Sequence, residues 1–583
     1  MPQKGFIEGM LIKCMLSNMG AYFLSCLTVV ITTVMVGALV DSNSLAAVSL
    51  CLPVYYFFAA IGTLIHTGTS TYAAIKIGKK DSEGANRFYT LSYTASAVCA
   101  AVILIIGLIF TKPIAIFLGA RGELIGITES YLRVLTIGAP AAILSYFPIS
   151  YIRITVKAEL APLCYLVQAA LSIILTYVFI VFFDMGATGA ALATVVANYV
   201  LVAVGIICIK KYSDFRITSI KDFKNEIIPT VKAGSPIALD SMGCLIRVLF
   251  LNTIAYRIGG TVGVCVIGIV SSISEFCAAF LLGAPQSMVS LIAIFKSEKD
   301  TYSIRKTVKA SVFFGLAVTF IFTVLLIVFA SYVADFYGIT EPAVNTVTAN
   351  CLRVFAPGLL FGLVSCSLAT VYATADNSIL ANVTVVLRNF LYIIPIALIF
   401  AAIKPDTVLL TSSFSIAEAL TLLTVFIAAK FIEKTSDKKH GILLLDDEVE
   451  RSGKIMAYSV KNTPEDIVEC SKNVSEFCEI NSLSSKVSMA ISLSIEEMLI
   501  VIGDKCLNNN PDERMDVRLF CTADNGVVGL RIRNGGQNFN ILEYADGHSD
   551  EIDCMGIMMI QKFSDVVEYL NTFGANNLLI LLR

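Results

Sequence analysis

The sequence predicts an all-α polytopic membrane protein that carries a small α/β domain at its C-terminal end. Three observations predict this fold class. Of the 583 residues, 56% are hydrophobic and only 15% are charged, a balance outside the range of soluble globular proteins. Apolar runs long enough to cross a bilayer recur up to about residue 433. The charged stretch KFIEKTSDKKHG, residues 430–441, then introduces a soluble composition.

Charge and cysteine usage narrow the function classes. The net charge of −2 gives no global attraction to nucleic acid, and no local basic patch is dense enough to suggest a nucleic-acid partner. The 16 cysteines are scattered, and they form no Cys-x-x-Cys motif and no Cys/His cluster with metal-ligand spacing. We therefore expect cysteines that act as small buried hydrophobic residues, and neither a resident metal nor a cofactor.

The apolar part divides into membrane spans. A helix needs roughly 20 predominantly apolar residues to cross the hydrocarbon core of a bilayer. By this criterion the chain contains twelve predicted transmembrane helices, at residues 14–39, 49–75, 89–111, 129–152, 162–183, 187–209, 228–256, 262–292, 307–333, 346–372, 378–402 and 407–431.

Lysine and arginine predict the orientation of these spans. The loops after the second, fourth, sixth and eighth spans contain Lys76, Lys79, Lys80, Arg87, Arg153, Lys157, Lys210, Lys211, Arg216, Lys221, Lys224, Lys296, Lys299, Arg305 and Lys306. The intervening loops contain only Lys112, Arg121, Arg257 and Lys404. Because cytoplasmic loops are enriched in these residues, we predict a plasma-membrane protein with both termini in the cytoplasm.

An internal repeat relates the two halves of the membrane part. AIKIGKKD at 74–81 returns as AIFKSEKD at 293–300, and YLRVLTIGAP at 131–140 returns as CLRVFAPGLL at 351–360. The matches include charged residues, such as Asp81 with Asp300, which chance similarity between apolar helices would not preserve. Six spans separate corresponding points, so the two copies run in the same direction through the membrane. The predicted domains are an N-lobe at 1–220, a C-lobe at 221–433, a linker at 434–452 and a soluble domain at 453–583.

Short motifs identify a family resemblance for residues 10–432. VGALVDSNSLAAVSLCLPV at 36–54, IGKKD at 77–81, GSPIAL at 234–239 and APQS at 284–287 are similar to motifs of the multidrug and toxic compound extrusion (MATE) family. The resemblance implies a V-shaped fold of two parallel six-helix repeats. It also implies a secondary transporter, not an enzyme, that couples Na+ or H+ entry to export of small organic, often cationic, compounds. The membrane lipid is its other expected partner.

Ionisable residues within predicted spans mark the candidate site, because a charge at the bilayer centre costs on the order of 3 kcal/mol. All of those selected lie in the second half: Asp240, Arg247, Glu275, Arg388 and Glu418. We predict that Asp240, Arg247, Glu275 and Glu418 bind the coupling cation or the substrate. The alternative for Asp240 is a structural pairing with Arg247, and Arg388 is expected to be a structural ion-pair partner.

The first half departs from the family pattern. MATE proteins commonly carry an aspartate a few residues before the pair that is Val36 and Gly37 here. This chain has Thr32 and Thr33 instead, and neither Asp nor Glu occurs between residues 14 and 40. The resemblance therefore implies no cation site of the usual kind in the N-lobe.

The sequence of the soluble domain predicts both helices and strands. Thr463 and Pro464 mark the start of a helix, and SSKVSMAISLSIEEMLIVIGDKC at 484–506 supplies a second helix. VRLFCTA and VVGLRIRN flank Asp524, Asn525 and Gly526, a pattern that predicts a β-hairpin. GIMMIQKFS at 556–564 predicts a short helix, and residues 565–583 predict two strands.

The order and motifs of this domain resemble the GHKL ATPase fold, closest to the anti-sigma-factor kinase branch. The resemblance assigns Glu497 to the catalytic glutamate and Gly536 to the glycine of the nucleotide loop, and it has Gly556 begin the last helix. It places Val501 where an Mg²⁺-binding asparagine belongs, and Asn534 where an aspartate binds adenine. Valine cannot ligate Mg²⁺, which requires oxygen ligands, and asparagine accepts a hydrogen bond without charge assistance. We expect a degenerate site without ATP as a cofactor, retained as a regulatory module or as the binding site of a cytoplasmic protein.

Two other functions remain open from the sequence. One is a flippase for lipid-linked precursors of the same superfamily, which Arg247 and Arg388 would suit. The other is a membrane receptor or regulator in which the helical part senses and the GHKL-like domain signals.

Overall fold

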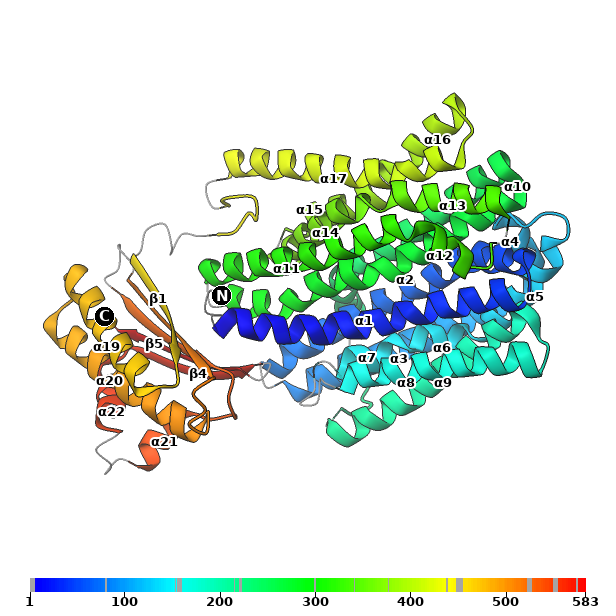
Figure 1. Cartoon of the computed structure of the whole chain (residues 1–583). Helices are drawn as coiled ribbons and strands as arrows, with labels where there is room; N and C mark the ends of the chain where they lie inside the picture. The colour runs from blue at the N-terminus through cyan, green and yellow to red at the C-terminus, as the bar shows by residue number, and fades with distance from the viewer. Residues whose placement is uncertain are drawn as a thin grey trace. The chain divides into compact units, whose positions relative to one another are not determined.

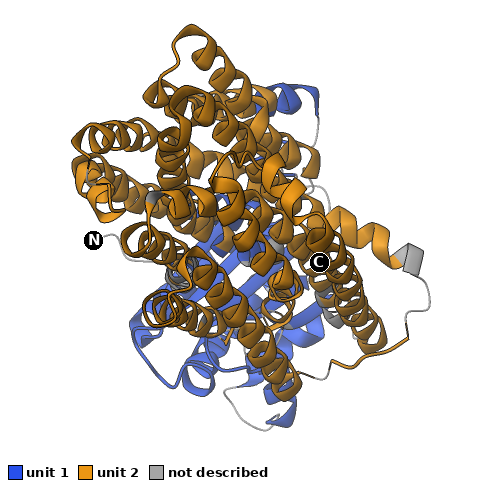
Figure 2. Cartoon of the chain, turned by 90° about the vertical axis from the view of Figure 1, so that its right-hand side faces the viewer, with its two compact units in different colours: residues 1–15, 287–311, 429–583 blue, residues 16–286, 312–428 orange. Residues whose placement is uncertain are grey.

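The computed structural model describes residues 6–78, 81–152, 154, 160–213, 215–219, 223–297, 300–339, 341–375, 377–436, 439–446, 454–521, 527–548, 554–572 and 575–582. The chain forms two compact units, coloured in Figure 2. Unit 1 comprises residues 1–15, 287–311 and 429–583, and unit 2 comprises residues 16–286 and 312–428. Several residues on which the topology and hairpin predictions rest lie outside the described ranges: Lys79, Lys80, Arg153, Lys157, Lys221, Lys299 and 524–526.

Long helices form the membrane part (Figure 1). The first half contains α1 Phe6–Leu39, α2 Ser42–Gly78, α3 Ser82–Ile109, α4 Thr111–Phe117, α5 Leu124–Ile137, α6 Ala139–Leu144, α7 Tyr146–Ile152, α8 Leu160–Tyr177, the π-helix η1 Val178–Phe182 and α9 Gly186–Tyr212. The second half contains α10 Phe223–Ser297, α11 Thr301–Val328, α12 Ala330–Phe336, α13 Pro342–Phe355, α14 Gly358–Thr374, α15 Ser378–Val386, the π-helix η2 Leu387–Leu391, α16 Ile393–Ile403 and α17 Thr407–Thr435. Each predicted span coincides with one of these helices or with a broken helix.

The number of spans remains a prediction. Nine of the described helices are long and apolar enough to cross a membrane, or ten if the bent pair Leu124–Ile137 and Ala139–Ile152 is one span. The helix α10 covers two of the twelve predicted segments, and its backbone is non-helical at Gly260. Its apolar stretch Ile237–Val289 has 53 residues. At 1.5 Å per residue this is about 80 Å, more than twice a hydrocarbon core of roughly 30 Å.

Apolar side chains cover much of the outer surface of the helical part. Phe117, Phe182 and Ile403 are 75%, 73% and 75% exposed. Such a surface would be costly in water and is stable when lipid covers it. The exposed apolar side chains thus agree with the hydropathy of the sequence.

The two halves repeat one another in local structure. The short helices α4 and α12 begin at Thr111 and Ala330, positions separated along the chain by the same interval as Asp81 and Asp300. Gly119 follows α4 with φ +106°, and Gly338, at the matching position after α12, has φ +80°. Both glycines occupy a backbone region that other residues rarely adopt. The repeat seen in the sequence therefore extends to helix boundaries and to turn geometry.

The C-terminal domain, residues 454–582 of unit 1, combines helices with one antiparallel sheet (Figure 1). Its elements are β1 Lys454–Lys461, α19 Pro464–Ile480, α20 Ser485–Lys505, β2 Arg514–Cys521, β3 Val528–Asn534, α21 Ile541–Gly547, α22 Met555–Phe563, β4 Val566–Thr572 and β5 Ala575–Leu582. The strand order among the described residues is β1-β2-β3-β5-β4. The antiparallel pairing of β2 and β3, the three expected helices and the two final strands are confirmed, whereas β1 and α21 were not predicted.

One apolar core lies between this sheet and its helices. It includes Ile491 and Ile495 of α20, Val517 of β2, Ile532 of β3 and Ile557 of α22, all at most 1% exposed. Thr463 occupies the predicted N-cap position of α19, but its side chain makes no capping hydrogen bond. Pro464 at the first helical position, which needs no backbone N–H, is sufficient to define the start.

Candidate functional site

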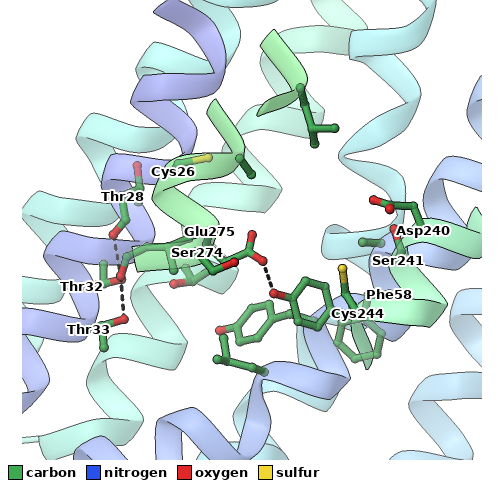
Figure 3. A pocket seen from close by; sticks show the side chains of 18 of the residues that line it. Cys26, Thr28, Thr32, Thr33, Phe58, Asp240, Ser241, Cys244, Ser274 and Glu275 are labelled. Atoms are coloured by element: carbon green, nitrogen blue, oxygen red, sulfur yellow. Dashed lines mark hydrogen bonds between the residues drawn. The ribbon is translucent and has the colours of Figure 1, made fainter. Parts of the chain in front are cut away.

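A cavity of about 460 Å³ lies within unit 2, and both halves of the repeat line it. Its charged lining residues are Asp240, Arg247, Glu275, Arg388 and Glu418. The four candidate residues and the expected structural arginine therefore line one cavity. Figure 3 shows Glu275 reaching into this space, with Thr32 and Thr33 to one side of it in the view and Asp240 to the other.

Asp240 and Arg247 are joined through Asn389. The Asn389 side chain donates from Nδ2 to Oδ1 of Asp240 over 2.7 Å, and its own Oδ1 accepts from Nη1 of Arg247 over 3.2 Å. The guanidinium also lies 5.4 Å from the ring centroid of Phe414. Two helical turns separate Asp240 from Arg247, so an amide from the π-helix η2 bridges them. Sequence analysis did not predict this bridge through Asn389.

Glu275 accepts a hydrogen bond from the hydroxyl of Tyr56. Glu275 lies in the C-terminal half of α10, and Tyr56 lies on α2 in the first half of the repeat. The repeat aligns Tyr56 with Glu275 itself, since the two are separated by the same interval as Asp81 and Asp300. A carboxylate in one half is therefore bound by the matching residue of the other half.

Arg388 and Glu418 form a salt bridge. Nε and Nη2 of Arg388 approach Oε1 of Glu418 to 3.1 and 2.8 Å. Ser365 donates to the second carboxylate oxygen over 2.9 Å, and Nη1 of Arg388 lies 2.6 Å from Sγ of Cys366. The two charged side chains are only 11% and 13% exposed. The expected ion-pair role of Arg388 thus has a geometric counterpart.

Among the described residues, the first-half wall of the cavity combines apolar side chains with polar, uncharged ones. The hydroxyls of Thr32 and Thr33 donate to the backbone carbonyls of Thr28 and Val29 over 2.8 and 2.6 Å. Gln168 donates to Asn198 over 3.1 Å. The Asp, Glu and Arg side chains that line the cavity among the described residues therefore come from the C-lobe, in agreement with the one-sided sequence pattern.

The proposed nucleotide residues of the C-terminal domain are engaged by the domain itself. Glu497 Oε2 accepts from the backbone N–H of Gly556 over 2.6 Å, at the start of α22. Val501 is 6% exposed and belongs to the apolar core. A side chain added at Gly536 would meet the backbone oxygen of Cys506 at 2.4 Å. The loop around Gly536 is thus packed against the end of α20.

Asn534 is part of a buried polar cluster. Its Oδ1 accepts from Nδ2 of Asn576 over 2.9 Å and from the backbone N–H of Gly536 over 3.3 Å, and Sγ of Cys506 lies 3.0 Å away. Asn534 is 4% exposed. Its carbonyl oxygen therefore holds neighbouring strands and the loop together. The GHKL resemblance is tested by none of the comparisons below and stays a prediction.

Comparisons with known proteins agree with the fold of the helical part. A model of the MatE family matches residues 19–178 and 236–399, together more than half of the chain. The chain is 27% identical over 398 residues to the multidrug export protein MepA of Staphylococcus aureus, covering 67% of this chain and 86% of that protein. It is also 27% identical over 332 residues to MepA of Staphylococcus saprophyticus, covering 56% and 72%.

Solved structures share the same fold. One is an inward-facing conformation of a multidrug resistance MATE family transporter of the MOP superfamily, with a TM-score of 0.63, 20% identity, and coverage of 72% of this chain and 95% of that one. Another is a MOP superfamily transporter from Pyrococcus furiosus, described as having a binding pocket of reversed polarity, with a TM-score of 0.64, 21% identity and coverage of 74% and 97%. The family match and the shared fold lead to one conclusion: the chain belongs to the MatE family, a family of multi-pass membrane transporters that are not enzymes.

Proposed function

We propose that this protein is an ion-coupled antiporter that exports organic, mainly cationic, compounds across the plasma membrane. The observation that carries the proposal is the cavity of about 460 Å³ that both halves line, with carboxylates in one half. Its volume suits a small organic ligand. Alternating access requires two halves that move around a central site, and the relatives named multidrug export proteins support this direction of transport.

The charge of the cavity favours a cationic substrate. Among the described lining residues, the carboxylates Asp240, Glu275 and Glu418 face the guanidinium groups of Arg247 and Arg388. With all five ionised, one negative charge is in excess. A cation about 4 Å from an uncompensated carboxylate gains on the order of 4 kcal/mol at an effective dielectric constant of 20. An anionic lipid-linked precursor would be repelled by this excess negative charge, which disfavours the flippase alternative.

We assign the coupling ion, Na+ or H+, to Asp240. Its neighbour Asn389 is neutral and holds one carboxylate oxygen at 2.7 Å, which leaves the other oxygen for a cation or proton. Glu418, by contrast, is neutralised by Arg388 at 2.8 Å. Asp240 can therefore change its charge partner during a transport cycle without leaving an arginine unpaired, as a coupling residue must.

Transport by Asp240→Asn tests the assignment. Proteoliposomes with an imposed Na+ or proton gradient should accumulate an organic cation such as ethidium with the wild-type protein, and Asp240→Asn should reduce the rate at least tenfold. Asp184→Asn is the control, because Asp184 lies exposed in a turn at φ +51°, a conformation that asparagine also tolerates. Wild-type coupling in Asp240→Asn would refute the assignment.

We further propose that the C-terminal domain is a regulatory module on the cytoplasmic side and binds no ATP. The engagement of Glu497 and Asn534 by neighbouring groups supports this role. Cysteines introduced at Ser82 and at Arg305, both exposed positions in predicted cytoplasmic loops, should react with an impermeant reagent added to the cytoplasmic face. Reaction from opposite faces would refute the parallel repeat.

A further inference from the structure

The strands β2 and β3 present an unusual charged face. On β2 the core residues Val517 and Leu519 alternate with Asp516 and Arg518, and on β3 Ile532 lies between Arg531 and Arg533. Successive residues of a strand point to opposite faces, so the charged residues share the face opposite α19, α20 and α22. In a sheet covered by helices on one side, this second face would ordinarily meet water. Here Arg518, Arg531 and Arg533 are each only 2% exposed.

The register places like charges next to each other. Arg518 is directly opposite Arg531, and Asp516 is opposite Arg533. Like charges in directly opposite positions destabilise a sheet, and buried arginines need a hydrogen-bonded counter-ion. Asp516 supplies one negative charge, with Oδ2 at 3.4 Å from Nη1 of Arg533. The four charged residues named here on β2 and β3 are thus three arginines and one aspartate.

Asp300, within the same compact unit, supplies a second carboxylate to these arginines. It precedes α11, is fully buried, and forms a salt bridge with Arg518. Its Oδ2 lies 2.8 Å from Nη2 of Arg533 and 3.9 Å from Nη1 of Arg531. The hydroxyl of Ser303 accepts from Nη1 of Arg533 over 3.3 Å. One aspartate thus contacts three arginines of the sheet.

The repeat shows that this arrangement is specific to the second half. Asp81, the counterpart of Asp300, caps α3 by accepting from the N–H of Gly84 over 2.9 Å, as Asp300 caps α11 through Ser303 over 2.9 Å. Asp81, however, has its own cation: Lys76 Nζ lies 2.8 Å away, and this hydrogen bond lowers the pKa of the Asp81 carboxyl.

Phe295 occupies the position of that lysine in the second copy. In the matching segments AIKIGKKD and AIFKSEKD, Lys76 and Phe295 are both the third residue. The Phe295 ring is covered by the guanidinium of Arg533, 4.6 Å from the ring centroid, a cation–π contact. The second copy has thus replaced its local cation with an aromatic ring that binds an arginine of the C-terminal domain.

We propose that the arginine face of the C-terminal sheet, formed by Arg518, Arg531 and Arg533, is a docking site for the segment that comprises Phe295 and Asp300–Ser303, and acts as a latch on the ends of α10 and α11. Both helices continue from this segment into the membrane part. The latch restrains the C-lobe helices and slows transport while it is closed. The restraint on transport rests on the proposed transport function, whereas the docking of the segment onto the sheet does not.

Hydrogen exchange on the full-length protein in detergent tests the docking. The primary variant is Phe295→Lys, which restores the first-half pattern and gives Asp300 a local cation in place of the arginines. It leaves the sheet sequence unchanged. We expect amides of Thr301–Lys306 to exchange at least tenfold faster than in the wild type, with α20 protected as before. Unchanged exchange would overturn the docking.

A variant of the opposite partner gives an independent result. Arg518→Gln combined with Arg533→Gln keeps the Asp300 cap intact, so faster exchange in Thr301–Lys306 would report loss of docking and not loss of the cap. Protection of the α20 amides from exchange reports whether the sheet still folds. If this protection is lost in the double variant, the exchange result for Phe295→Lys alone tests the docking. Protection of the segment with a folded sheet lacking both arginines would contradict the proposal.

The restraint is tested by efflux rates. Phe295→Lys and Asp300→Asn should each raise the initial rate at least threefold, and Asp81→Asn, the matched control of the first half, should leave it unchanged. An unchanged or slower rate in Phe295→Lys would overturn the restraint. A wild-type protein that transports nothing would refute the proposed function and leave the exchange result standing.

Discussion

Helices α2 and α10 approach each other closely at two glycines. A Cβ atom added at Gly234 would lie 2.1 Å from the backbone oxygen of Leu64, and one added at Gly68 would lie 2.1 Å from the backbone oxygen of Thr230. Small residues permit such contact between membrane helices. Because an ordinary contact of this kind is longer by more than about 1 Å, and because backbone atoms cannot rotate away, Gly234→Ala must push the helices apart.

The loss of stability expected for Gly234→Ala follows from the size of this steric clash. Overpacking by one methyl group in a close-packed region typically costs about 1–3 kcal/mol. Gly234→Ala should therefore lower the thermal unfolding midpoint of the detergent-solubilised protein. Gly259→Ala, in the same helix, is the control because nothing lies within 4 Å of the added methyl group. Equal midpoints for the two variants would refute the inferred contact between α2 and α10.

Three further predictions concern buried groups. Glu418→Gln should destabilise the protein by about 3–5 kcal/mol because Arg388 loses its counter-ion. The control Glu129→Gln breaks an exposed ion pair within a helix and should cost less than about 0.5 kcal/mol. Equal denaturation curves for the two variants would contradict this prediction. Burial raises the pKa of Cys470 to about 12. At pH 8.5 the thiolate fraction of Cys470 should therefore be on the order of a thousandfold lower in the folded protein than in urea, and its alkylation rate, followed by peptide mass spectrometry, should fall accordingly. Alkylation at the rate seen in urea would exclude a folded core around Cys470. Val501→Asn should cost about 1–3 kcal/mol by placing an amide in the apolar core without creating Mg-ATP binding in calorimetry; millimolar or tighter binding would show that a usable site exists.

Hydropathy and repetition predicted most of the helical part because both are local properties. Apolar runs mark helices wherever lipid or other helices cover them, and the recurrence of Asp81 as Asp300 could be read directly from the letters. The break of α10 at Gly260 falls in the gap between the predicted spans 228–256 and 262–292, whereas the backbone conformation at this break, φ +59°, is seen only in the structure.

The charged residues of the candidate site were predicted because they carry charge, and its neutral residues were not predicted. Asp240, Glu275 and Glu418 stand out because ionisable residues are costly in a membrane. Asn389 carries no charge, so nothing in the sequence distinguished it from other asparagines, although it bridges Asp240 and Arg247. Tertiary hydrogen bonds of neutral side chains leave no pattern at helical spacing.

The arginines of the C-terminal sheet show a second limit. Their alternation with apolar residues on β2 and β3 predicts a solvent-exposed face. Their burial depends on Asp300, which lies far earlier in the chain, before α11. The signal that could have revealed it is the change from Lys76 in the first copy to Phe295 in the second, which removes the lysine that pairs with Asp81 from the matching position beside Asp300.

Substrate-driven ion movement in proteoliposomes tests the central claim most directly. Vesicles containing the full-length protein, with a pH-sensitive or Na+-sensitive dye inside, would receive an outward or inward gradient of an organic cation and no imposed ion gradient. The account predicts ion flux opposite to the substrate, saturating with substrate concentration and lost in Asp240→Asn. Saturable substrate binding by the wild-type protein with no movement of either ion would contradict the account and identify the protein as a receptor.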